Sequence, residues 1–144
     1  MKEPQGLVRS DGKRPDGVTQ IPWSEGKCAS WDVTVTDTLA ASNVNVSSTA
    51  AGSAAEVAAS KKLHKYAVIM SSYSFVPIAF ETLGPINSAG ADFIDEIGRR
   101  TQAITGDLRE KTFLWQRLSM ALQRYNAVCF RGTFSDMAFQ SSGD

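Results

Sequence analysis

Two aspartates and two lysines in the first half of the chain are the residue types best suited to chemistry on a phosphate ester. Asp16 follows Pro15 at the head of one expected strand, and Asp32 lies inside the next. Lys62 and Lys65 lie on the helix expected after them. Carboxylates are natural ligands of hard divalent ions, which activate water and absorb charge on a phosphate. The pattern therefore suggests a metal site with an ammonium group beside it.

The elements that must position these side chains alternate between strands and helices. Hydrophobic patterning, capping residues and turn residues predict strands over 18–23, 28–36 and 74–82, and helices over 54–71, 88–104 and 107–128. The predicted fold class is α/β (α+β), a small mixed β-sheet with flanking helices in the order strand-strand-helix-strand-helix-helix.

The sheet topology follows from the connections between the strands. The segment Ser24-Glu25-Gly26-Lys27 is typical of a hairpin turn, so the first two strands should be antiparallel. A helix separates the second and third strands and permits a parallel crossover. Pro77 lacks an amide hydrogen, which indicates an edge position or a bulge for the third strand.

The second strand has the clearest alternation in the chain. Trp31, Val33 and Val35 alternate with polar residues and should face the core. Asp32 and Thr34 should share the opposite face. An acid inside such a strand would be costly if it were buried without a partner.

The helix after the second strand begins with a capping box over residues 53–56. Its expected packed stripe includes Ala55 and Tyr66, and Lys62 lies on the same stripe. A lysine on a packed face needs a carboxylate nearby, and Asp32 is the obvious candidate.

The composition describes an ordinary single domain. The chain has 144 residues, with Lys+Arg and Asp+Glu both 15, so its charge does not indicate a nucleic-acid partner. We expect one domain over 1–131 and a flexible tail over 132–144. Cys28 and Cys129 show no metal-ligand spacing, and His64 is the one histidine, which disfavours a zinc site. No apolar run suits a membrane span, so we expect an intracellular protein, nuclear or cytoplasmic.

Four blocks of the sequence resemble a known family. They occur in order and at similar spacing, and they are Arg14-Pro15-Asp16, Asp32-Val33-Thr34-Val35, Lys62-x-x-Lys65-Tyr66 and Phe75-x-Pro77-x-x-x-Glu81-Thr82-x-Gly84. Over about residues 4–130 the chain is similar to the restriction-endonuclease-like domain of the PD-(D/E)XK superfamily, in the form found at the C-terminal end of reverse-transcriptase retroelement polyproteins. The resemblance implies cleavage of DNA with Mg²⁺ (or Mn²⁺), and an upstream reverse transcriptase region in a longer polyprotein.

The resemblance also implies roles for particular residues. Asp16 would be the first acidic metal ligand and Asp32 the second. Thr34 stands where the superfamily usually has a lysine, so either Lys62 or Lys65 takes over that charge, or the site is inactive. Glu81 would assist.

Each of these residues also has a structural interpretation. Asp16 is next to Gly17 and could be a turn aspartate, and Asp32 could lie on a solvated sheet face. The two lysines could form the wet side of a helix. Glu81 is either a third metal ligand or a cap for the turn at Gly84. Four arginines have spacings that suit phosphate contacts or simply a solvated face, and they are Arg99, Arg100, Arg117 and Arg124.

Three functions remain open at this point. The first is a metal-dependent DNA endonuclease-like domain of retroelement origin. The second is a nucleic-acid-binding or interaction module that has kept the fold and lost the chemistry, which Thr34 favours. The third, an unrelated hydrolase that uses His64, lacks the Gly-x-Ser-x-Gly turn that would accompany it.

Overall fold

The computed structural model describes residues 14–40, 43 and 50–141. The chain forms two compact units, Met1–Phe93 and Ile94–Asp144, and every candidate metal ligand and catalytic lysine lies in the first. The single domain expected over 1–131 stays a prediction. The last residues of the expected tail, 142–144, lie outside the described part of the chain.

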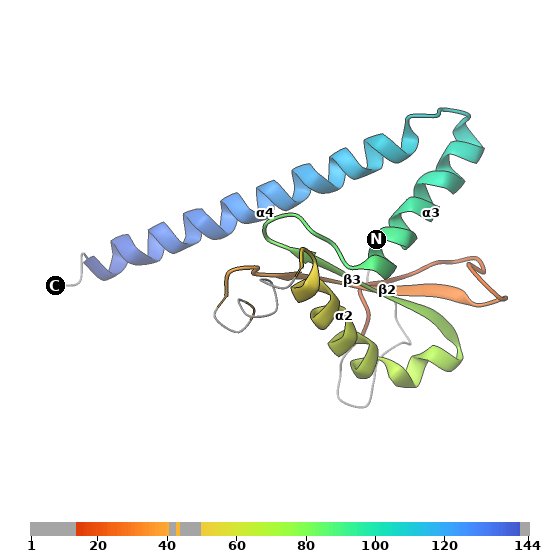
Figure 1. The fold of residues 1–144 in the computed structure, drawn as a ribbon, viewed down its shortest axis with the longest axis horizontal. Helices are drawn as coiled ribbons and strands as arrows, with labels where there is room; N and C mark the ends of the chain where they lie inside the picture. Colours follow the sequence, from red (N-terminus) through yellow and green to blue (C-terminus); the bar gives the residue numbers. More distant parts are fainter. Residues whose placement is uncertain (1–13, 41–42, 44–49, 142–144) are drawn as a thin grey trace. The chain divides into compact units, whose positions relative to one another are not determined.

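The first unit is built on a small mixed sheet, as predicted. Its strands are β1 (Gly17–Val18), β2 (Cys28–Thr36) and β3 (Tyr73–Glu81), in the order β1-β2-β3. β1 pairs antiparallel with β2, and β2 pairs parallel with β3 along its whole length. Helix α2 (Ser53–Lys65) connects the two parallel strands and packs on the sheet (Figure 1).

The hairpin forms at the predicted turn, but its first strand is much shorter than expected. Glu25 and Gly26 both have positive φ, 51° and 74°, which matches the twist of a two-residue hairpin loop. The Thr19 hydroxyl accepts a hydrogen bond from the Ala29 amide at 2.9 Å, where a backbone carbonyl would continue the ladder. The strand expected over 18–23 therefore ends at Val18.

The order of elements differs from the prediction by one short helix. The helix expected over 54–71 ends at Lys65, and a 3₁₀ helix, η1 (Ala67–Ser71), stands between α2 and β3. The break lies at Tyr66, whose backbone leaves the helical range at φ −107° and ψ 17° while its side chain is buried. The chain then continues in the tighter helix.

The face of β2 that packs on α2 is the one that carries Asp32, whereas Trp31, Val33 and Val35 were expected to face the core. The prediction is right only for Trp31, which packs against the buried ring of Phe93 from the opposite face. The core beneath α2 consists of Ala55, Ala59 and Ala79. These small side chains let the helix lie close to the sheet, and Asp32 is only 4% exposed. On the other face Val33 is 45% exposed. Alternation identified the strand, but the alanines on its partners decided which face α2 covers.

The capping box expected over 53–56 is also wrong. The residue before α2 is Gly52, with φ 88° and no side chain to cap the helix. The Glu56 carboxylate instead accepts hydrogen bonds from the Ser88 amide at 2.5 Å and hydroxyl at 2.8 Å. Glu56 therefore caps α3 (Ser88–Thr105), which begins where predicted.

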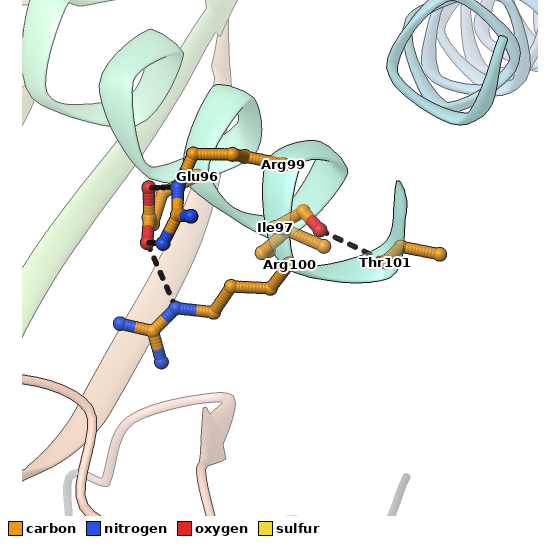
Figure 2. A network of polar contacts seen from close by, with 5 residues as sticks. All are labelled: Glu96, Ile97, Arg99, Arg100 and Thr101. Atoms are coloured by element: carbon orange, nitrogen blue, oxygen red, sulfur yellow. Dashed lines mark hydrogen bonds and ion pairs between the residues drawn. The ribbon is translucent and has the colours of Figure 1, made fainter. Parts of the chain in front are cut away.

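The second unit contains most of α3 and the long helix α4 (Glu110–Ser141). On α3, Glu96 accepts hydrogen bonds from both Arg99 and Arg100 (Figure 2). Helix α4 runs beyond its predicted end near Val128, and the predicted tail therefore begins inside a helix. Within the described residues, no helix is both long enough and apolar enough to cross a bilayer.

Candidate functional site

The centre of the candidate site is an ion pair between β2 and α2. Lys62 Nζ lies 2.6 Å from Asp32 Oδ2, and the side chains are 25% and 6% exposed. Lys62 reaches the sheet because it lies on the packed stripe of α2, one turn beyond the core alanine Ala59. The expected pairing of Lys62 with Asp32 is therefore present.

The buried Asp32 carboxylate has the Lys62 ammonium as its close charged partner. Oδ2 accepts no well-aligned hydrogen bond from the described residues, so its contact with Lys62 is that of an ion pair. Burial raises the pKa of Asp32 above its ordinary value, and the nearby Asp16 charge raises it further, while Lys62 works in the opposite direction. A buried acid with a perturbed pKa and a specific charge partner is a frequent feature of functional sites.

Asp16 joins the cluster from the segment that leads into β1. Its Oδ2 accepts a hydrogen bond from the Val33 amide at 2.7 Å, and its own amide donates to the Trp31 carbonyl at 2.9 Å. Both contacts flank Asp32 along β2, and the charge of Asp16 raises the pKa of Asp32. The structure therefore brings together Asp16, Asp32 and Lys62, which carry two negative charges and one positive charge.

Lys65 has a different position from Lys62. Its amine lies over the ring of Tyr66, 5.0 Å from the ring centre. The ammonium group paired with Asp32 is that of Lys62. Thr34 lies on the same face of β2 as Asp32, two residues further along, as expected.

Glu81 lies at the other end of the sheet. In the parallel register Asp32 is paired with Pro77, and Glu81 with Thr36, four residues further along the strand. Four residues of β-strand span about 13 Å, too far to share one ion with Asp32. Glu81 is 1% exposed, and its carboxylate accepts a hydrogen bond from the Ala55 amide at 3.4 Å, at the start of α2.

The donor set suits a hard divalent ion that keeps several waters. The structure groups no three His, Cys, Asp or Glu side chains of the described residues into a metal cage. Mg²⁺ is commonly held by one or two carboxylates together with water and substrate phosphate, so Asp16 and Asp32 would suffice. Two carboxylates beside one ammonium group give the cluster a formal net negative charge, which would favour a bound cation.

Two groups that shape this site have no signal in the sequence. The Val33 backbone amide holds Asp16, and the Tyr66 hydroxyl donates to the Arg14 carbonyl at 2.9 Å. A strand valine and a buried tyrosine are ordinary core residues, and only their register reveals these contacts.

Comparison of the chain with protein-family models, with curated proteins and with solved structures gives no match. The arrangement of Asp16, Asp32 and Lys62 is therefore what a functional assignment has to start from.

Proposed function

We propose that the chain is a metal-dependent, restriction-endonuclease-like domain that hydrolyses phosphodiester bonds in DNA. The observation that carries this proposal is the joint placement of Asp16, Asp32 and Lys62, with the ammonium 2.6 Å from a buried carboxylate. A retroelement origin, with a reverse transcriptase region upstream, belongs to the same proposal and rests on the four sequence blocks alone.

Asp16 and Asp32 would hold Mg²⁺ or Mn²⁺, which supplies an activated water and neutralises charge on the phosphate when bound. Both carboxylates are anchored for this task. The Asp16 carboxylate is fixed by the Val33 amide, and the Asp32 carboxylate by its ion pair with Lys62. Geometry held in advance lowers the cost of reaching the transition state.

Lys62 supplies the positive charge nearest to these acids. In hydrolysis a water adds to phosphorus and one ester P–O bond breaks, so negative charge grows on the phosphate oxygens. The Lys62 ammonium, one quarter exposed, can contact such an oxygen or lower the pKa of the attacking water. It stands in for the lysine that Thr34 replaces in the strand.

A second candidate function is a nucleic-acid-binding module without hydrolysis. One observation favours it specifically. Lys62 already neutralises the buried oxygen of Asp32, as in a purely structural ion pair. In this case the domain would bind DNA and leave it intact.

Plasmid cleavage with Mg²⁺ or Mn²⁺ distinguishes the two functions. The full chain is compared with Asp32→Asn and Lys62→Ala, and thermal unfolding of each variant monitors the fold. For the endonuclease we expect cleavage by the full chain, and rates lower by about 10²- to 10³-fold in both variants, as for loss of a charge at a reacting phosphate.

Lys61→Ala is the matched control, because Lys61 is an exposed lysine of the same helix with no place in the cluster. It should cleave at the full rate. DNA binding without cleavage by the full chain would select the second function. Equal cleavage by all four proteins would come from a contaminating nuclease and would overturn the assignment of the site.

A further inference from the structure

The carboxylate of Asp16 comes from the segment that leads into β1, a strand of two residues, and contacts with β2 hold its near side. A contact from another element would fix this segment further. The Tyr66 hydroxyl makes such a contact. It donates a hydrogen bond to the Arg14 carbonyl at 2.9 Å, across 52 residues of sequence. Tyr66 is 1% exposed, so its hydroxyl would be costly to leave without a partner.

The chain from Arg14 to Asp16 leaves little freedom between this bond and the Asp16 carboxylate. Pro15, the residue between them, is fully buried, and its ring fixes φ. The Asp16 amide then donates to the Trp31 carbonyl, and its carboxylate accepts from the Val33 amide. Each of the three residues from Arg14 to Asp16 is therefore constrained, either by a hydrogen bond or by burial.

The ring of Tyr66 is buried beside β3. It packs against Phe75 of β3, with the ring centres 4.9 Å apart. Tyr66 is the residue that caps the C-terminal end of α2, one helical turn after Lys62. One end of α2 therefore presents both the ammonium that contacts Asp32 and the hydroxyl that fixes the segment with Asp16.

We infer that Tyr66 is a positioning residue, whose hydroxyl sets the Asp16 carboxylate beside Asp32 through the Arg14 carbonyl. Its use in metal binding rests on the proposed function, but the positioning does not. Tyr66 does not contact the reacting atoms in this scheme and is not a catalytic residue.

The test is Tyr66→Phe, which keeps the ring and removes the hydroxyl. The readout is hydrogen exchange of the Val33 amide in the full chain, since this amide is covered by Asp16 Oδ2. The Ile78 amide, on the β3 residue paired with Val33, serves as an internal reference for general loosening. Loss of one neutral hydrogen bond should speed Val33 exchange about three- to tenfold relative to Ile78.

Phe75→Leu is the control, because it removes the ring packing against Tyr66 and leaves the hydroxyl in place. It should leave the ratio of Val33 to Ile78 exchange unchanged, even where overall stability falls. An unchanged ratio in Tyr66→Phe, or an equal rise in both variants, would overturn the inference.

Mn²⁺ affinity of the full chain separates this inference from the proposed function. If Asp16 is a ligand, Tyr66→Phe should weaken Mn²⁺ binding about as much as it speeds Val33 exchange. Faster Val33 exchange in a chain whose wild type binds no Mn²⁺ would support the positioning role and overturn the metal site.

Discussion

A carboxylate buried under a helix, with one lysine as its main partner, costs free energy that the rest of the domain must offset. For Asp32 this cost appears as a raised pKa, caused first by burial and then by the charge of Asp16. Replacement of such a pair by apolar residues is often neutral or stabilising, so stability alone does not account for it. The Asp32–Lys62 ion pair is therefore the first place in the chain at which to test for a function.

The first prediction concerns the pH dependence of stability. A raised pKa means that the folded state keeps the Asp32 proton to higher pH than the unfolded state, whose pKa is near 3.8. Wild-type stability should therefore fall relative to Asp32→Asn as the pH rises from 3.8 through the folded-state pKa, by at most about 1.4 kcal/mol per pH unit. Urea unfolding at a series of pH values measures this.

The control for this experiment is Asp16→Asn, which removes one of the causes of the shift. Without the Asp16 charge the folded-state pKa of Asp32 should lie closer to its unfolded value. The free energy of unfolding should then fall over a narrower pH range. Parallel pH profiles for wild type and Asp32→Asn would show that Asp32 ionises as freely in the folded chain as in the unfolded one.

The second prediction concerns Gly17, next to Asp16. A Cβ atom at this position would lie 2.1 Å from Trp31 Cζ2, so either the indole or the strand must move. Gly17→Ala should reduce the free energy of unfolding by about 1–3 kcal/mol, the usual cost of overpacking. Gly132→Ala is the matched control, since a Cβ in α4 meets nothing within 4 Å there, and it should stabilise the helix by up to about 1 kcal/mol. Chemical denaturation measures the free energy of unfolding of both variants. A change in the same direction in both would contradict the prediction.

At the scale of elements, the ends of α2 have different tasks. The C-terminal end carries Lys62 and Tyr66, which face the candidate site. The N-terminal end is preceded by a glycine, and the buried Glu81 carboxylate accepts a hydrogen bond from its Ala55 amide. A negative charge at a helix N-terminus is favourable, so Glu81 acts here as a cap from a neighbouring strand.

The third prediction follows from this division. Glu81→Gln should lower the free energy of unfolding by about 0.5–2 kcal/mol, since a charged cap becomes neutral. The metal dependence of cleavage should not change, because Glu81 is four residues along the sheet from Asp32. Asp16→Asn is the comparison that should change it. If Glu81→Gln needed a different Mg²⁺ concentration for cleavage, Glu81 would have to be counted as a metal ligand.

The elements also show which parts of the structure the sequence could predict. Alternation and turn residues predicted β2, β3 and the hairpin, and the crossover helix predicted the parallel pairing. The lysine on a packed stripe correctly indicated an ion pair with Asp32. The partner of Glu56 and the distance of Glu81 from Asp32 depend on which elements pack together and in which register, and spacing along one chain does not contain that information.

At the scale of the whole molecule, a net charge of zero conceals a local excess of positive charge. From Lys111 to Ser135 the sequence has no Asp or Glu. Exposed Arg117 and Arg124 lie there, seven residues apart, and form no ion pair with the described residues. Arg99 and Arg109, in contrast, pair with Glu96 and Asp107. Hydrogen bonds from Arg99 and Arg100 lower the pKa of Glu96 to about 2, and Arg109 holds the pKa of Asp107 below its usual range.

The fourth prediction is that Arg117 and Arg124 contact DNA phosphates. The double variant Arg117→Gln/Arg124→Gln should weaken DNA binding and reduce the slope of log K against log salt by about 1.8, from about 0.9 per phosphate contact. Arg99→Gln/Arg109→Gln changes the net charge equally but removes arginines that already have acidic partners. It should change the slope much less. Fluorescence anisotropy over a salt series measures both, and equal slopes for the two variants would place the DNA elsewhere.

Asn87 covers part of the outer edge of β3, which affects whether the sheet can pair with other molecules at high concentration. Its buried side chain accepts a hydrogen bond from the Ala79 amide and donates one to the Pro77 carbonyl, and the Glu81 amide donates to the Pro85 carbonyl. β3 is the last strand of its sheet, and an open strand of this kind would recruit strands from other molecules. The 85–87 segment occupies the outward backbone groups of β3 from Pro77 to Glu81, so this half of the edge cannot pair with a strand of another molecule.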